Sequence, residues 1–159
     1  MNEKIAMQDL YGETWAQCYG CGRLNEHGLQ IKSYIEGDEV VCHFRPKPYH
    51  TAIPGYVYGG LVASLIDCHG TGAAAAAGYA AEGRAPGTEP ALRYVTASLK
   101  VDFLRPTPLG PVLELRARTR EVRGRKVILD ITLTAEGELC ARGEIICVRI
   151  PDDFGRVKE

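Results

Sequence analysis

Asp67 is the residue of this sequence best placed to do chemistry. It stands inside Leu61–Ala81, the longest apolar stretch of the chain, where an ionised carboxylate is costly to bury unless it has partners. A carboxylate held in this way can activate a water molecule as a general base, or attack a carbonyl carbon itself. The alternative is a structural Asp that holds a loop or an interface partner. Thr71 follows four residues later and therefore shares a helix face with Asp67.

Two glycines before this stretch predict where a reacting carbonyl group would bind. Gly59 and Gly60 stand at the expected start of a helix. The first backbone N–H groups of a helix have no partner within it, and the positive end of the helix dipole favours an oxyanion that develops there. Glycine also leaves room for close approach of the carbonyl. The same pair is also compatible with an ordinary tight turn before a helix.

The chain has six cysteines, and Cys18-x-x-Cys21 has the spacing of a metal-binding pair. A tetrahedral structural site needs four ligands, and no second Cys pair of suitable spacing exists in the sequence. A redox role would need a strand-to-helix context, which is absent. We therefore expect a packed turn and no metal. The other four stand in apolar segments, where a free Cys behaves as a small hydrophobic residue: Cys42, Cys68, Cys140 and Cys147.

One long helix is expected to position Asp67, from Gly59 to about Ala81. Leu61, Leu65 and the run of alanines make this helix apolar nearly all round, which indicates an internal helix. Two glycines in its interior each cost about 1 kcal/mol relative to alanine. Their presence favours close packing of another backbone against the helix.

Strands are expected both before and after this helix in the sequence. Residues 29–35 and 39–44 predict a hairpin around the turn at Gly37-Asp38. Alternation of apolar and polar residues over four later segments predicts an antiparallel sheet with one buried face. The last segment changes phase around Gly143, which predicts a bulge. These four segments lie at 98–103, 113–120, 127–134 and 139–150.

Composition limits the class of protein. The chain has 159 residues, of which 45% are hydrophobic and 25% charged, which is typical of one soluble domain and excludes a disordered chain. A net charge of −1 disfavours nucleic-acid binding through phosphate contacts. Asp67 and His69 interrupt the longest apolar stretch, which disfavours a membrane span. The first residues lack the pattern of a signal peptide, so we expect a cytoplasmic protein.

These elements predict an α+β architecture, with an antiparallel sheet of five to six strands wrapped around one long central helix. We expect a single domain over residues 1–159, in which 1–17 form an N-terminal extension with a short helix and 151–159 a polar tail. One curved sheet covers only part of so apolar a helix, so a second subunit is expected.

Several motifs follow one another over residues 18–150: CYGCG at 18–22, Asn25 with Gly28-Leu29, PGYVYGGLVASLID at 54–67, LKVDFLRPTP at 99–108 and GRK at 124–126. This order resembles the PaaI-like branch of the hotdog-fold acyl-CoA thioesterases. The resemblance implies a homodimer with a continuous sheet, or a homotetramer, and an active site between protomers. Coenzyme A would lie along the surface as part of the substrate, and no cofactor or metal is implied.

The resemblance also implies roles for individual residues. Asp67 takes the catalytic acidic position, and an N–H at Gly59 or Gly60 polarises the thioester carbonyl. Thr71 and Thr96 match positions at which related enzymes hold the attacking water. The alternative for each threonine is a buried hydroxyl that bonds a backbone carbonyl.

Tyr58 departs from the family pattern, which usually has His before the two glycines. A tyrosine hydroxyl can bond a carbonyl or a carboxylate, but it does not titrate near neutral pH. Either Tyr58 orients the substrate, or the protein has lost part of its catalytic power. His50, eight residues earlier, is a further candidate for substrate contact, with an ordinary surface-loop histidine as the alternative.

Four basic residues are candidates for contact with coenzyme A phosphates, because guanidinium groups match phosphate geometry. The alternative is that those in the expected turn at 123–126 are solvated charges. The four are Arg105, Arg123, Arg125 and Lys126.

The function predicted from the sequence is hydrolysis of an acyl-CoA thioester to a carboxylic acid and coenzyme A. Asp67, from the neighbouring protomer, would activate water or form a mixed anhydride. The rival is a non-catalytic acyl-CoA-binding or regulatory hotdog protein, which Tyr58 keeps open. A hotdog hydratase is a third possibility, but its usual Asp/His pair is not visible at the equivalent spacing. The acyl chain cannot be read from the sequence.

Overall fold

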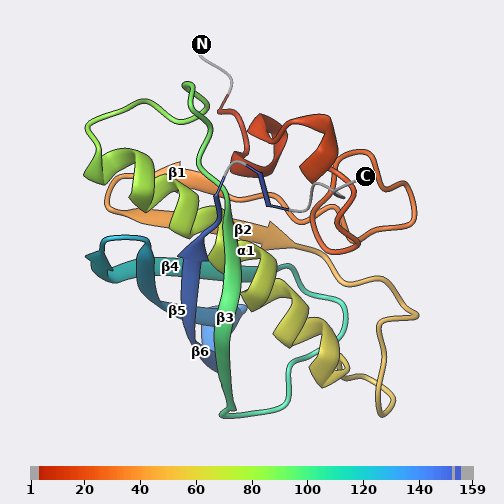
Figure 1. The fold of residues 1–159 in the computed structure, drawn as a ribbon. Coiled ribbons are helices and arrows are strands. Elements are labelled where there is room, and N and C mark those ends of the chain that lie inside the picture. The colour runs from red at the N-terminus through yellow and green to blue at the C-terminus, as the bar shows by residue number, and fades with distance from the viewer. Residues whose placement is uncertain (1–3, 152, 155–159) are drawn as a thin grey trace.

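A single helix lies against one six-stranded antiparallel sheet in the computed structural model, which describes residues 4–151, 153 and 154 (Figure 1). The order across the sheet is β1-β2-β4-β5-β6-β3. This confirms the α+β architecture expected from the sequence. The elements are β1 (Tyr34–Glu36), β2 (Glu39–Phe44), α1 (Gly59–Ala81), β3 (Tyr94–Phe103), β4 (Leu113–Arg123), β5 (Lys126–Ala135) and β6 (Glu138–Arg149).

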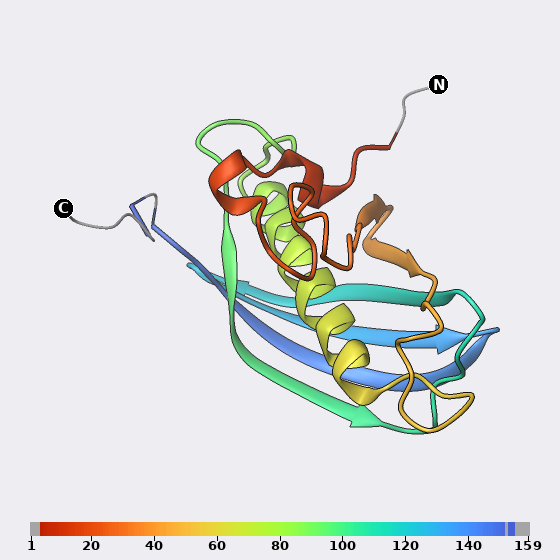
Figure 2. The ribbon, with the colours of Figure 1, turned by 90° about the vertical axis from the view of Figure 1, so that its right-hand side faces the viewer.

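The sheet curves around α1, so that the helix lies in its concave side (Figure 2). Apolar side chains of the helix and of the sheet are fully buried between them, and this contact supplies most of the hydrophobic core. The helix begins at Gly59, as its apolar pattern predicts. The largest buried side chains of this layer are Leu61, Leu65, Ile66, Leu113, Leu115, Leu129, Ile131, Leu133 and Ile145.

Three details of the expected elements were wrong. The first strand is only three residues long, because Gln30 has a φ of 56° and the backbone N–H of Leu29 and Ile31 bond the carbonyls of Tyr19 and Gly20 instead of a neighbouring strand. The N-terminal helix is a pair of 3₁₀ turns, η1 (Met7–Leu10) and η2 (Glu13–Trp15). Met7 is buried in the core, so this segment packs as part of the domain. Most of the polar tail lies outside the described residues.

The third wrong detail is the position of the bulge that was expected at Gly143. Gly143 pairs in register with Val101 on one side and Ile131 on the other. β6 does contain an extra residue, but three positions earlier: Leu139 pairs with Thr134 and Ala141 pairs with Leu133, so the bulge lies at Cys140. Gly143 is needed because a Cβ there would lie 2.5 Å from Cγ2 of Ile66 on α1. The glycine therefore permits close approach of helix and sheet.

Replacing Gly143 by Ala is expected to destabilise the fold by about 1–3 kcal/mol, because the added methyl group overpacks the contact with Ile66. The change is measured by urea unfolding. Gly12→Ala is the control, since a Cβ at Gly12 has nothing within 4 Å, and its effect should stay within about 0.5 kcal/mol. Equal stability of the two variants would contradict this account.

The glycines inside the helix have a similar role, although they meet side chains where a backbone was expected. A Cβ at Gly70 would lie 2.7 Å from Cδ1 of Ile145, and a Cβ at Gly72 would lie 2.6 Å from Nε2 of Gln8. Both positions therefore make room for side chains that pack across the helix. None of the described helices is long and apolar enough to cross a membrane.

Candidate active site

Asp67 projects from the third turn of α1 and is half-buried. The hydroxyl of Thr96, on β3, donates a hydrogen bond to Oδ1 of Asp67. The two residues are 29 positions apart in the sequence, and the packing of α1 on β3 brings them together. The other carboxylate oxygen has no hydrogen-bond partner among the described residues, and a carboxylate with one oxygen held and one open has the arrangement that a general base or a nucleophile needs.

Thr71 lies on the same side of α1 as Asp67, as the spacing predicts. Its hydroxyl donates a 3.1 Å hydrogen bond to the backbone carbonyl of Cys68. This contact agrees with the alternative interpretation of Thr71, a threonine whose hydroxyl bonds a backbone carbonyl of its own helix. A role for Thr71 in holding water stays a prediction.

The two glycines form the exposed N-terminal turn of α1, with Tyr58 at the N-cap. A Cβ on Gly60 would lie 2.2 Å from Cε2 of Tyr58, so the tyrosine ring covers this glycine closely. A Cβ on Gly59 would lie 3.4 Å from the ring of Phe103, an ordinary contact. Tyr58 is 46% exposed. The first N–H groups of the helix thus lie at the surface, beneath an aromatic ring.

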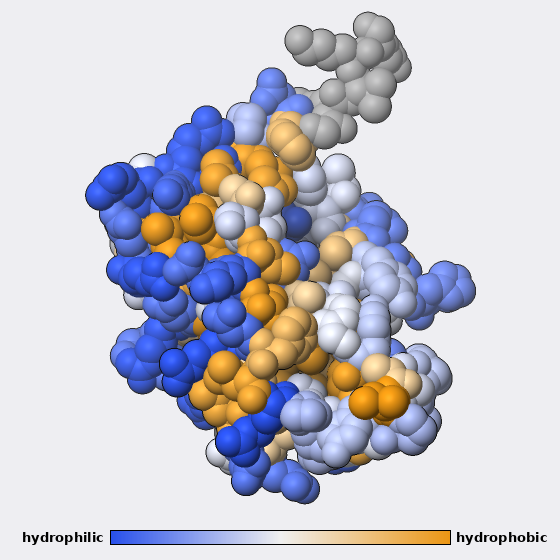
Figure 3. Space-filling model, turned by 90° about the horizontal axis from the view of Figure 1, so that it is seen from below, coloured by the Kyte–Doolittle hydropathy of each residue, from blue (hydrophilic) through white to orange (hydrophobic). Residues whose placement is uncertain are grey.

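A hollow lies beside this turn, lined by Gly59 and Val62 of the helix and by residues of the two loops that flank it. Hydrophobic side chains gather in a band on this lower face of the molecule (Figure 3). Three side chains that line the hollow are large and more than half exposed: Ile53 at 67%, Phe103 at 57% and Leu104 at 52%. An apolar part of a ligand would find matching surface here.

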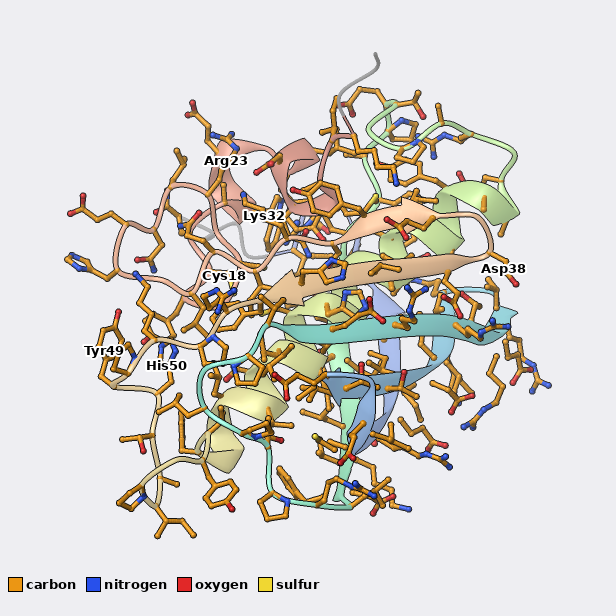
Figure 4. All side chains as sticks on the ribbon, turned by 180° about the vertical axis from the view of Figure 1, so that it is seen from behind. Cys18, Arg23, Lys32, Asp38, Tyr49 and His50 are labelled. Carbon is orange, nitrogen blue, oxygen red and sulfur yellow. The ribbon has the colours of Figure 1, made fainter. Side chains whose placement is uncertain are left out.

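His50 lies on the loop between β2 and α1, side by side with Tyr49 (Figure 4). Its carbonyl accepts the backbone N–H of Tyr58 at 3.1 Å, and its Nδ1 accepts the backbone N–H of Lys47 at 2.9 Å. Burial, and then the charge of Lys47, lower the pKa of His50. The ring thus braces the loop through Nδ1, while its backbone holds Tyr58.

The four basic candidates fall at opposite ends of the sheet. Arg105 follows β3 beside Gly59 and pairs with Glu138. Lys126 instead stands opposite Val148, at the level where β3 begins. A strand advances about 3.3 Å per residue, so the ten residues of β3 separate the two positions by roughly 30 Å. Arg123 pairs with Glu121 at 2.9 Å, and Arg125 donates to the carbonyl of Arg149 at 3.2 Å.

The candidate residues therefore form two groups in one chain. Tyr58, Gly59, Gly60, His50 and Arg105 lie at the N-terminal end of α1, while Asp67 and Thr96 lie further along the helix. An α-helix rises 1.5 Å per residue, so the seven residues from Gly60 to Asp67 separate the two groups by about 10 Å. One chain alone does not bring the carboxylate to the helix N-terminus.

Two contacts in the middle of α1 were not foreseen from the sequence. His69 is fully buried, and its Nδ1 lies 2.8 Å from the hydroxyl of Ser33. Cys68 approaches Cys18, with 3.9 Å between the two sulfur atoms. Both contacts join α1 to the segment before β1, and no local spacing signals them.

A central helix in a curved six-stranded antiparallel sheet, with a half-buried carboxylate on that helix, defines a hotdog-fold domain. The chain belongs to the thioesterase superfamily, whose family model matches residues 54–141. This confirms the family resemblance and the hotdog fold expected from the motifs.

Solved structures agree. A thioesterase superfamily protein from Shewanella loihica PV-4 is 46% identical with a TM-score of 0.68, and the match covers 91% of this chain and 99% of that chain. The E. coli PaaI protein is 21% identical with a TM-score of 0.63, over 77% of this chain and 81% of that chain, and so shares the fold.

Curated relatives include the acyl-coenzyme A thioesterase THEM4 of Xenopus laevis, which is 38% identical over 99 residues, or 62% of this chain and 39% of that protein. THEM4 of Bos taurus is 28% identical over 125 residues, or 77% of this chain and 46% of that protein. The matched region is thus less than half the length of these curated relatives.

Proposed function

We propose that this protein hydrolyses acyl-CoA thioesters. The observation that carries the proposal is the half-buried carboxylate of Asp67, held by the Thr96 hydroxyl on the central helix of a thioesterase-superfamily domain. The acyl-CoA thioesterase names of the curated relatives support coenzyme A as the carrier of the acyl group.

The active site is completed by a second copy of the chain. β3 is an edge strand of the sheet, so its outer backbone groups are available to pair with another strand. Its apolar side chains lack cover in one chain: Leu99 is 37% exposed and Phe103 is 57% exposed. Antiparallel pairing of β3 with its copy would extend the sheet and cover these residues.

A twofold dimer of this kind would also bring together the two groups of candidate residues that lie apart within one chain. Two copies of α1 that run antiparallel place the N-terminal end of one helix toward the later turns of the other. Gly59 and Gly60 of one protomer would then meet Asp67 and Thr96 of its partner. The protomer that supplies Asp67 would also supply the basic turn with Arg123, Arg125 and Lys126. The protomer that supplies the glycines would also supply Arg105.

The chemistry follows from these positions. The thioester carbonyl accepts hydrogen bonds from the N–H groups at the helix start, which stabilise the oxyanion. Asp67 takes a proton from water as the water oxygen bonds to the carbonyl carbon. The carbon–sulfur bond then breaks, and the leaving sulfur takes the proton from Asp67, so that the acid and the thiol of coenzyme A are released and the carboxylate is regenerated. In the nucleophilic form of the mechanism, Asp67 attacks first and water hydrolyses the mixed anhydride.

Thr96→Val is expected to lower kcat about tenfold, because a hydrogen bond to a charged group contributes roughly 1.5 kcal/mol and orients the Asp67 carboxylate. Thr96→Ser keeps the hydroxyl and is the matched control, with a rate near that of the wild type. Steady-state kinetics with one acyl-CoA measure both. A Val variant with an unchanged kcat would assign Thr96 a purely structural role.

The test of the proposed function is release of free thiol from a panel of acyl-CoA esters that differ in chain length and shape. Turnover of at least one ester supports hydrolysis. One observation favours the rival, a non-catalytic acyl-CoA binder: the Tyr58 ring covers Gly60, where the carbonyl has to approach. Saturable binding of these esters by the same preparation, without release of thiol, would establish that rival.

A further inference from the structure

Three cysteine thiols from distant parts of the chain converge on one point. Cys18 and Cys21 belong to the turn before β1, and Cys68 belongs to α1. Their sulfur atoms all lie within 4.8 Å of one another. Cys21 and Cys68 are buried, and Cys18 is exposed on the N-terminal segment (Figure 4). The cluster is therefore closed toward the core and open on one side.

These separations are close to those of sulfur ligands around one metal ion. A Zn–S bond of about 2.3 Å in tetrahedral geometry places two ligand sulfurs roughly 3.8 Å apart. The sulfurs of Cys18 and Cys68 are 3.9 Å apart. A contraction of the other pairs by at most about 1 Å would complete a three-thiolate site.

The turn is built around these sulfurs. A Cβ on Gly20 would lie 2.2 Å from the sulfur of Cys68, so only a glycine lets the backbone pass over it. A cysteine binds a metal ion as the thiolate, so each thiol gives up its proton when the ion binds.

A half-buried cation lies beside the cluster. The Arg93 guanidinium stacks 3.5 Å from the centre of the Tyr11 ring, and its Nε and Nη1 atoms are buried without a hydrogen-bond partner among the described residues. Its charge also acts on Cys18 and Cys21. Three thiolates around a divalent ion carry one net negative charge, which this guanidinium would balance.

We propose that Cys18, Cys21 and Cys68 bind one thiophilic cation of the Zn²⁺ type, with a fourth coordination position open to solvent beside Cys18. The ion joins the N-terminal segment to α1 and stabilises their contact. No metal was expected from the sequence because a second Cys pair is absent, whereas the fold supplies the third ligand from the helix. The site does not depend on the proposed hydrolysis.

The test is a titration of the reduced full chain with Cd²⁺ in oxygen-free buffer. Sulfur-to-cadmium charge-transfer absorption should rise and saturate at one Cd²⁺ per chain, and Zn²⁺ should abolish it by displacement. Zn²⁺ should also raise the Tm, because the folded chain, which brings the three thiols together, binds it more tightly than the unfolded chain. Cys18→Ser should lower the affinity on the order of 100-fold, since one thiolate is lost.

Cys18 is exposed, so its Ser variant is expected to fold, and circular dichroism checks this. Cys42→Ala, which removes a buried thiol outside the cluster, is the matched control and should bind Cd²⁺ like the wild type. An absent or unsaturable signal, equal affinity of Cys18→Ser and wild type, or equal losses in Cys18→Ser and Cys42→Ala would each overturn the proposal.

Discussion

Asp67→Asn is expected to lower the rate of thioester hydrolysis by about 100- to 10,000-fold, the usual contribution of a positioned general base. Asn has the same shape as Asp, and its amide oxygen can still accept the hydroxyl of Thr96. The amide neither takes a proton from water near neutral pH nor attacks a carbonyl as a carboxylate does. The loss should therefore appear in kcat, measured by thiol release.

The variant should retain the fold and the ability to bind substrate. Asp67 is half-buried, and the substitution removes a charge without a change of volume, so the Tm and the oligomer size should stay near those of the wild type. Affinity for acyl-CoA, measured by calorimetry, should also remain. Full turnover by a folded Asp67→Asn variant would refute the proposed role.

The helix and the later strands could be predicted because their signals are local. The apolar stretch that follows Gly59 is too long for a strand and therefore predicts a helix. The alternation at 113–120 and 127–134 predicts strands of a sheet with one buried face. The hairpin around Gly37-Asp38 was also confirmed, but its first strand is shorter than predicted. Gln30 adopts a positive φ there, and residues near 29–31 bond the turn at 19–20 instead.

The contacts of the candidate site could be predicted only in part, because they depend on packing between distant segments. Asp67 stood out as a carboxylate in an apolar helix. Thr96 was identified only by resemblance, since nothing local relates two residues 29 positions apart. Cys68 was interpreted as a small core residue, and its approach to Cys18 depends on how the N-terminal turn packs on α1.

A phase change in a strand also has more than one physical cause. The change in the apolar pattern of the last strand predicted a bulge at Gly143. In the structure Ala141, Gly143 and Ile145 are all buried, so the alternation of buried residues continues through Gly143. Cys140 is buried as well, next to the register shift, and this breaks the pattern. Close approach of Ile66 accounts for the glycine itself.

Mixing two inactive variants should restore activity if each active site is shared between two chains. Asp67→Asn removes the carboxylate. Gly60→Ala places a methyl group where the Tyr58 ring now lies, which displaces the ring and obstructs the helix N–H groups. A mixed dimer has one site with both changes and one with neither. Random reassociation of equal amounts should therefore recover about a quarter of the wild-type rate.

The design separates a shared site from a site within one chain. If Asp67 and Gly60 of the same chain formed the site, every site in the mixture would carry one change, and the mixture would stay as inactive as its components. The exchange of subunits is verified with differently tagged chains and native mass spectrometry, and the mixture is assayed before and after it. Because the roughly 10 Å between Gly60 and Asp67 follows from the helical rise alone, recovery after exchange is the result expected from this fold.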